Sequence, residues 1–193
     1  MKEENINRIL DLGVEIISRK GYHSLGLKEL LDEAGIPKGS FYYYFKSKED
    51  FGQKVINHYS ENTLKYIKEI LQDDSKSPGE RFRYMFKERE KVYRMSGFKE
   101  GCLMGTCSTE LAGQYQSMQL LLEDKFSDWR EVISQCIREG QEQGEFQIDL
   151  PSDDLADFII NNWEGAMVRM KAAGAVKPYL LFVDYTMRLI LRS

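Results

Sequence analysis

Apolar residues recur every three or four positions along most of the chain, which is the pattern of helices that bury one face. The first such run covers residues 6–17 and ends at Gly21. A second run, residues 27–34, stops at Gly35-Ile36-Pro37, because Pro lacks an N–H and restricts the residue before it. A new short helix is predicted directly after Pro37.

The same pattern predicts helices through the rest of the chain. Ser47-Lys48-Glu49-Asp50 resembles a capping box and opens a long helix. A polar linker, residues 72–77, separates it from a helix that begins at Ser77-Pro78 and ends at Gly97. Residues 144–150 alternate apolar and polar positions, but an isolated strand is unstable, so we interpret them as a loop. Further helices fit residues 101–112, 117–143, 152–173 and 178–192, which makes an all-α fold of about nine helices.

The segment around Pro37 has the layout of a helix-turn-helix. Lys38-Gly39-Ser40 is small or cationic and lies at a helix N-terminus, where free N–H groups favour phosphate. Phe41 and Phe45 can point inward, whereas the three tyrosines between them cannot all be buried. The segment therefore indicates a helix that approaches DNA.

AGIPKGSFYYYFKSKEDF, residues 34–51, is similar to the helix-turn-helix signature of TetR/AcrR-family transcriptional regulators. The family commonly has Ser or Thr where this chain has Gly26, and His where it has Tyr44. The resemblance implies a three-helix DNA-binding head, residues 1–48, and a helical ligand-binding and dimerisation body, residues 49–193. It also implies that the protein represses transcription and leaves DNA when an effector binds.

The resemblance further implies which residues contact DNA. Tyr42 and Tyr44 match positions that often bind phosphate, and Lys48 matches one that often touches the DNA backbone. Lys28 and Tyr43 are the candidates for reading sequence, because only contacts to base edges specify it. Core packing or a solvated ring is the alternative for each tyrosine. The predicted set is Lys28, Lys38, Gly39, Ser40, Tyr42, Tyr43, Tyr44 and Lys48.

A homodimer through the last two helices is the family's usual assembly, and two apolar stripes are suited to it. Two-fold pairs bind half-sites about 34 to 36 Å apart, so the operator should be a near-palindrome. The expected partners are this double-stranded DNA, a second copy of the chain and a small-molecule effector. The stripes are Leu155, Phe158, Ile159, Trp163, Ala166, Met167 and Met170, then Leu180, Leu181, Val183, Met187, Leu189 and Ile190.

A second, shorter likeness lies in GCLMGTCSTELAG, residues 101–113. It resembles a segment of NemR-type and AcuR-type members of the family, some of which respond to reactive electrophiles or small unsaturated acids. Cys102 would lie in the first turn of a helix, where partial positive charge favours a thiolate, and Lys171 is a conceivable cationic partner. Inert packing is the alternative for Cys102, and the stronger interpretation for Cys107 and Cys136.

Large apolar residues of the body are suited to wall an effector pocket, although an ordinary core would contain the same types. They are Met85, Phe86, Tyr93, Phe98, Met104, Trp129, Trp163 and Met167.

The charge distribution fits a DNA-binding head. The net charge of the 193 residues is −4, which is unusual for a DNA-binding protein. Residues 1–58 carry nine Lys/Arg and nine Asp/Glu, so the acidic excess lies beyond them. Residues 38–54 contain four lysines against Glu49 and Asp50, which is a local positive patch. A polar N-terminus and the lack of a long apolar stretch predict a cytoplasmic protein without a membrane segment.

Other functional classes have weaker support. Three cysteines without C-x-x-C spacing argue against a disulfide scaffold or a zinc cluster. His23 and His58, the only histidines, belong to no metal or nucleophile motif, so we expect no metal, cofactor or catalysis. A thiol enzyme that uses Cys102 and a helical protein-interaction module whose tyrosines meet protein are the alternatives.

Overall fold

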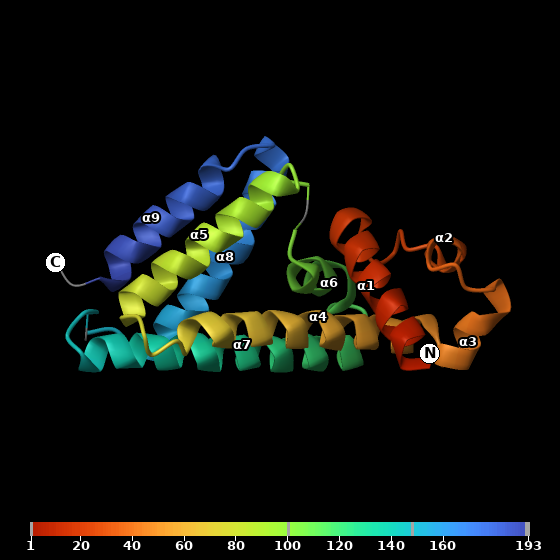
Figure 1. Ribbon diagram of the computed structural model, residues 1–193, viewed down its shortest axis with the longest axis horizontal. Coiled ribbons are helices and arrows are strands. Elements are labelled where there is room, and N and C mark those ends of the chain that lie inside the picture. The colour runs from red at the N-terminus through yellow and green to blue at the C-terminus, as the bar shows by residue number, and fades with distance from the viewer. Residues whose placement is uncertain (1, 100, 148, 192–193) are drawn as a thin grey trace. The chain divides into compact units, whose positions relative to one another are not determined.

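The structure is a computed structural model that describes residues 2–99, 101–147 and 149–191, without the side chains of Lys2, Glu3 and Lys38. These ranges are all-α, as predicted, and Figure 1 labels their helices. The helices are α1 (Lys2–Lys20), α2 (Leu27–Glu33), η1 (Lys38–Ser40), α3 (Phe41–Tyr44), α4 (Lys48–Leu71), α5 (Pro78–Met95), α6 (Leu103–Leu111), α7 (Gln116–Glu142), α8 (Ser152–Ala173) and α9 (Lys177–Ile190).

α4 and α5 begin at the serine caps that the sequence predicts, whereas α1 begins at Lys2, before the first apolar run, and α6 begins at Leu103, two residues later than expected. Ser77 caps α5 in a complete capping box with Glu80. Ser47 Oγ accepts a hydrogen bond from Asp50 N at 3.0 Å, but the Asp50 carboxylate returns to Lys46 N at 2.9 Å, one residue before the expected partner. Gly26 is the N-cap of α2 and offers no side-chain hydrogen bond.

The segment after α7 is a loop, as predicted. Phe146 pairs with Leu191 in an isolated antiparallel bridge, and Gln147 N donates to Ile190 O at 3.0 Å. The side chain of Phe146 is fully buried, and a Cβ built on Gly140 would lie 2.3 Å from its ring. Gly140 therefore provides the space in α7 that this ring occupies. Ile148, which belongs to the predicted loop, lies outside the described residues.

The chain forms two compact units. Unit 1 comprises Met1–Asn62 and Cys102–Lys125, and unit 2 comprises Thr63–Gly101 and Phe126–Ser193. α4 and α7 each run without interruption from one unit into the other. The units describe packing, whereas the predicted division into residues 1–48 and 49–193 concerns function and stays a prediction.

Unit 1 is built around α1. This helix packs on both α2 and α6, and its buried residues include Ile9, Ile16 and Ile17 (Figure 1). Gly13 lies on the α4 side, where an added Cβ would be 2.7 Å from the ring of Phe51. The amphipathic first run of the sequence therefore forms the core that supports the helix-turn-helix.

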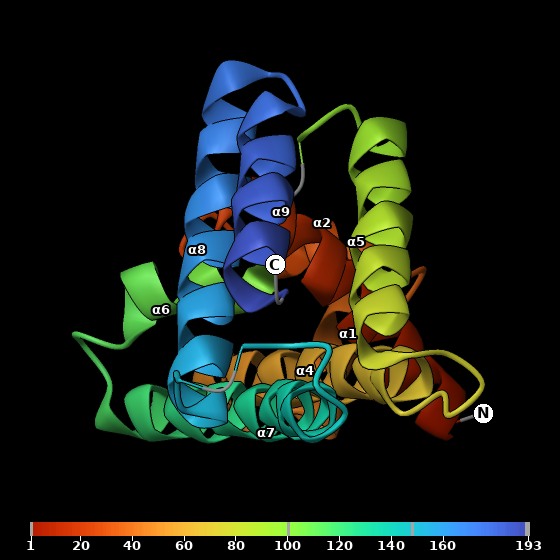
Figure 2. The same ribbon diagram turned by 90° about the vertical axis from the view of Figure 1, so that its left-hand side faces the viewer.

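In unit 2, α5, α8 and α9 run side by side in both ribbon views (Figures 1 and 2). Tyr179 and Phe182 of α9 pack with Phe86 of α5 and Trp163 of α8, at ring-centroid distances of 5.4 to 6.3 Å. Tyr179 OH donates to Phe86 O at 2.9 Å, so the hydroxyl of this fully buried ring has a partner. An aromatic cluster therefore joins the three helices.

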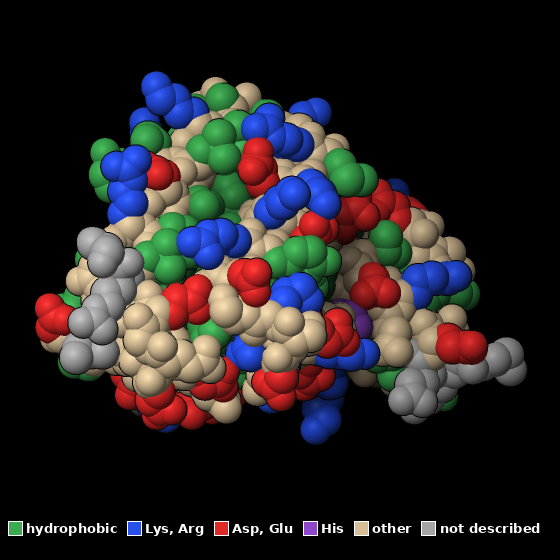
Figure 3. Space-filling view, turned by 60° about the vertical axis from the view of Figure 1, so that its left-hand side comes forward, with side chains coloured by type: hydrophobic (Ala, Val, Ile, Leu, Met, Phe, Trp, Pro, Cys, Tyr) green, Lys and Arg blue, Asp and Glu red, His purple; other side chains and the backbone are tan. Residues whose placement is uncertain are grey.

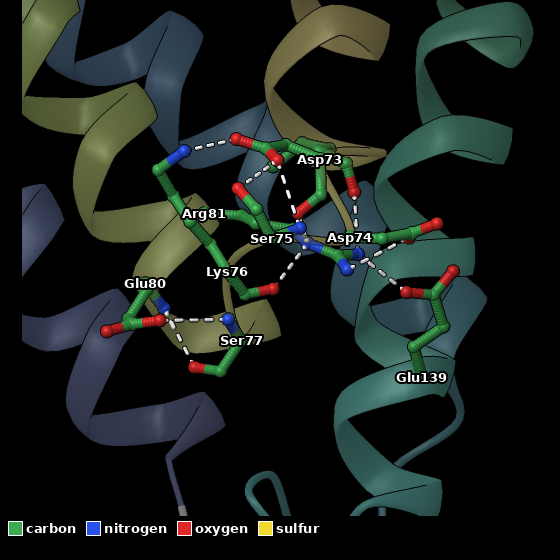
Figure 4. A network of polar contacts seen from close by, with 9 residues as sticks. Asp73, Asp74, Ser75, Lys76, Ser77, Glu80, Arg81 and Glu139 are labelled. Carbon is green, nitrogen blue, oxygen red and sulfur yellow. Dashed lines mark hydrogen bonds and ion pairs between the residues drawn. The ribbon is translucent and has the colours of Figure 1, made fainter.

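A buried arginine of α5 is the centre of a network of polar contacts in unit 2 (Figure 4). Arg81, 3% exposed, donates through Nη1 to Leu71 O at 3.0 Å, which is one of the carbonyls that the end of α4 leaves without an intrahelical partner. Its Nε donates to Asp73 O at 2.9 Å and to Lys76 O at 3.0 Å, and its Nη1 lies 2.6 Å from Glu139 Oε2. One guanidinium thus ties the ends of α4 and α7 to α5.

The surface carries both charge signs. On the face drawn in Figure 3, Lys and Arg side chains lie among Asp and Glu and between patches of apolar side chains. Among the helices described, none is both long enough and apolar enough to cross a lipid bilayer.

We predict that Arg81→Met lowers the free energy of unfolding by about 3 kcal/mol, because three backbone carbonyls and Glu139 lose a charged donor. Urea denaturation followed by circular dichroism measures the change. Arg83→Met, at an exposed position of the same helix, is the matched control and should stay within about 0.5 kcal/mol of the parent protein. Equal effects of the two substitutions would contradict the structural role of Arg81.

Candidate nucleic-acid interface

The helix after Pro37 is too short to be stable alone. η1 and α3 together cover only residues 38–44, and an isolated helix of this length does not persist in water. Phe41 and Phe45 fix it, since each is 1% exposed and their ring centroids lie 5.2 Å apart. Both rings pack on Phe51 of α4, at 5.8 and 4.9 Å. The predicted inward direction of the two phenylalanines is therefore confirmed.

Anchoring these rings sets the direction of the tyrosines between them. Tyr42 and Tyr43 are 71% and 66% exposed, so neither belongs to the core of this chain. Tyr44 is half-buried, and its hydroxyl accepts a hydrogen bond from Asn5 Nδ2 at 3.3 Å. Tyr42 and Tyr43 thus point outward, whereas Tyr44 also contacts α1.

The start of this helix is sterically open. Gly39 is exposed, and a Cβ built on it would meet no protein atom within 4 Å. Packing inside the chain therefore does not require glycine here, whereas close approach of an outside partner would. Ser40 is half-buried, and the side chain of Lys38 lies outside the described residues.

The lysines of the predicted set differ in their surroundings. Lys28 is exposed on α2. Lys48 is half-buried: its ammonium donates to Leu25 O at 3.0 Å and lies 5.1 Å from the centre of the Tyr22 ring. Tyr22 OH donates in return to Lys48 O at 2.9 Å. Burial raises the pKa of Tyr22 to about 12, so this donor keeps its proton at neutral pH.

The sequence predicts a DNA contact for Lys48 but does not predict its contacts inside unit 1. No sequence signal links Lys48 to a carbonyl 23 residues earlier in the chain. Lys54 forms an ion pair with Asp50 at 2.6 Å, which agrees with its exclusion from the predicted set. The DNA contacts of all eight residues stay predictions.

Two family models match the chain. Residues 9–53 match the tetR family of bacterial regulatory proteins, and residues 78–185 match the tetracyclin repressor-like C-terminal domain. The chain belongs to the TetR family. It is thus a DNA-binding transcriptional regulator.

Curated relatives agree with the predicted branch. The transcriptional regulator AcuR of Cereibacter sphaeroides is 34% identical over 84% of this chain and 74% of its own length. The transcriptional repressor DhaR of Mycobacterium sp. GP1 is 32% identical over 96% and 91%. The crystal structure of reduced Escherichia coli NemR has the same fold, with a TM-score of 0.88 at 23% identity over 98% of this chain and all of that one. The expected likeness to AcuR and NemR is confirmed.

All three cysteines of this TetR-family chain are buried, but their neighbours differ. Cys102 is the N-cap of α6, one position before the expected first turn, and Tyr59 OH donates to its sulfur at 3.7 Å. Burial raises the pKa values of Cys107 and Cys136 to about 12, so both are protonated and inert at neutral pH. Lys171 is exposed near the end of α8 in unit 2, whereas Cys102 belongs to unit 1, and their pairing stays a prediction.

Part of the predicted effector pocket forms one cluster in unit 2. Trp163 Nε1 donates to Tyr93 OH at 2.9 Å, and Tyr93 OH lies 3.1 Å from Met167 Sδ. Met85 and Phe86 are buried in the same unit, and Phe86 contacts Trp163. Trp129 makes its ring contact with Phe126, Met104 belongs to unit 1, and Phe98 has a left-handed backbone with φ 62°.

Sequence reasoning missed Tyr179 and Phe182, which complete this cluster from α9. They lie next to the residues of the last helix that we assigned to dimerisation, and apolar periodicity cannot tell which apolar face meets which neighbour.

The two stripes predicted for dimerisation need correction. In α8, Leu155, Ile159 and Met170 are at most 3% exposed, and Ala166 and Met167 are also buried. In α9, Met187 and Ile190 are buried, whereas Val183 and Leu189 are half-buried. Most of the residues therefore serve the core of the subunit, because both helices are apolar on more than one face. The exposed large apolar residues of these helices are Phe158, Val168, Leu180, Leu181 and Tyr185.

Proposed function

We propose that the chain is a homodimeric repressor that binds a near-palindromic operator and leaves it when a small molecule or electrophile binds the body. The outward direction of Tyr42 and Tyr43, on a helix anchored by Phe41 and Phe45, carries the proposal. Selection of bound fragments from random duplex DNA tests it. Recovery of a two-fold symmetric sequence supports the proposal, and recovery of unrelated sequences contradicts it.

The proposed DNA contacts are those that the family resemblance implies, and the exposure of Lys28, Tyr42 and Tyr43 supports three of them. Tyr42 and Tyr44 donate hydroxyls to phosphate, and Lys28 and Tyr43 reach base edges. Gly39 and Ser40 let the backbone approach, with Lys38 beside them. Lys48 has one ammonium proton on Leu25 O, and we propose that another is directed to phosphate. Such a lysine is held in place before DNA arrives, which reduces the entropy that binding costs.

The proposed dimer surface is the outer face of α8 and α9. Phe158 and Val168 are 45% and 68% exposed on α8, and Leu181 and Tyr185 are 48% and 66% exposed on α9. Exposed apolar patches of this kind mark association sites when neighbouring helices contribute to them together. A second copy would bury the same patch on both chains, as two-fold symmetry requires.

The proposed effector response acts on a two-state equilibrium. Only a ligand that binds one arrangement of the dimer more tightly than another can release DNA. The aromatic cluster around Trp163 and Tyr93 is one proposed contact region, and Cys102 is the proposed reactive residue. Its sulfur would bond to the β-carbon of an unsaturated carbonyl compound, and its proton would end on the α-carbon. We assign the chain no catalytic turnover.

We predict that Tyr42→Phe weakens binding to all duplex sequences roughly 10-fold, because one hydrogen bond to a charged phosphate is lost. The stability of Tyr42→Phe should not change, since the ring is 71% exposed.

Lys48→Ala should lower the slope of log affinity against log salt by about one. Fluorescence anisotropy at several salt concentrations measures both. Lys54→Ala is the control, and a slope unchanged by Lys48→Ala would remove this residue from the contacts.

We predict that Leu181→Glu converts the dimer to monomers at micromolar concentration, because association would bury an unpaired carboxylate. Sedimentation velocity measures the assembly. Leu120→Glu, at a 64% exposed position of α7, is the matched control and should remain dimeric. A dimer that survives Leu181→Glu would place the interface elsewhere.

We predict that Cys102→Ser keeps operator affinity but loses release by N-ethylmaleimide. Operator binding before and after treatment, with mass spectrometry of the labelled protein, measures both effects. One adduct per chain with loss of binding supports a sensor, whereas repeated consumption of reagent would indicate an enzyme. Release retained by Cys102→Ser would place the response at another residue.

A further inference from the structure

Residues 21–26 form the turn that joins α1 to α2, which we call the head turn. The C-terminal end of α6 holds this turn. Glu110 is the last residue but one of α6, and its Oε2 accepts a hydrogen bond from His23 N at 2.9 Å. The ring Nε2 of His23 lies 3.4 Å from Glu110 O. A residue 87 positions away thus binds the head turn through its side chain and its backbone.

The backbone conformation of Gly21 and the lack of a side chain leave room for the Glu110 carboxylate. Its φ of +88° lies in the left-handed region that favours glycine, and the residue is buried. A Cβ built on Gly21 would lie 2.1 Å from Glu110 Oε1. The carboxylate therefore occupies the space that any other side chain at position 21 would need.

The start of α4 also holds the head turn. Tyr22 OH donates to Lys48 O, and the Lys48 ammonium lies over the Tyr22 ring and donates to Leu25 O. A Cβ on Gly52 would lie 2.6 Å from the Tyr22 ring, so Tyr22 packs directly on the backbone of α4. The head turn is thus held by Lys48 and by Glu110, and all three belong to unit 1.

The conformation of the head turn sets the direction in which α2 leaves α1. η1 follows α2 and packs on it, and α3 packs on η1. The direction of α2 therefore also affects where Tyr42 and Tyr43 point. We propose that Glu110 is a positioning residue for DNA binding, whose carboxylate holds the head turn in the conformation that the operator requires. The inference rests on the proposed function and adds a residue to it.

The sign of the effect separates positioning from simple electrostatics. A carboxylate in a DNA-binding unit repels phosphate, so its removal should leave affinity unchanged or increase it. Loss of a positioning contact has the opposite result, because the free protein then samples conformations that cannot bind. Weaker binding after removal of a negative charge is therefore specific to the positioning role.

We predict that Glu110→Ala binds the selected operator at least 10-fold more weakly than the parent protein at the same salt concentration. Glu110→Gln keeps an oxygen that can accept from His23 N and should stay within about threefold of the parent. Glu123→Ala removes an exposed carboxylate of α7 in the same unit, and should bind as tightly as the parent or more tightly. Fluorescence anisotropy measures all four proteins.

Two further readouts separate this inference from a loss of folding and from the proposed function. Without DNA, the His23 amide should exchange with solvent faster in Glu110→Ala than in the parent protein. Should Glu110→Ala not fold, Glu110→Asp keeps the charge but withdraws the carboxylate, and should also bind at least 10-fold more weakly. A parent protein that binds no operator would reject the proposed function. A parent that binds, with folded Glu110→Ala or Glu110→Asp variants of equal or higher affinity, would overturn this inference alone.

Discussion

Burial of Phe41 and Phe45 against Phe51 is the constraint on which the candidate interface depends. A helix of four residues, preceded by one turn of 3-10 helix, gains too little from its own hydrogen bonds to persist. The two rings supply the missing stabilisation, since full burial of such a side chain contributes about 1.5 to 3 kcal/mol. Because both phenylalanines lie on one face of the helix, Tyr42 and Tyr43 between them face outward. One packing interaction thus both forms the helix and exposes Tyr42 and Tyr43.

The same support extends along unit 1 through contacts between residues far apart in sequence. Phe51 belongs to α4, the helix whose first residue, Lys48, binds the head turn. α6 also contacts that turn, through Glu110, and its N-cap is Cys102. The residue proposed to react with electrophiles therefore caps the same short helix that carries the residue proposed to position the head. In unit 2, Arg81 joins the ends of α4 and α7, the two helices that continue into unit 1.

The helices could be predicted from sequence because their apolar periodicity and capping residues are local signals. The helix-turn-helix was predicted from Pro37 and the Phe41–Phe45 spacing for the same reason. The orientation of α8 and α9 could not be predicted, because neighbours such as Phe158 and Ile159 are equally apolar and only packing separates the exposed one from the buried one. Lys48 and Glu110 bind backbone atoms of distant segments, and Arg81 binds the carboxylate of Glu139, 58 residues away. Such partners leave no pattern in the sequence.

The central claim is that Tyr42 and Tyr43 meet DNA, and nitration by tetranitromethane with and without operator tests it most directly. Mass spectrometry reports each tyrosine without any substitution, and Tyr84, 45% exposed on α5, serves as the internal reference. The account predicts that operator DNA slows nitration of Tyr42 and Tyr43 at least 10-fold and leaves Tyr84 unchanged. Equal nitration of Tyr42 and Tyr43 in the free and DNA-bound protein would contradict it.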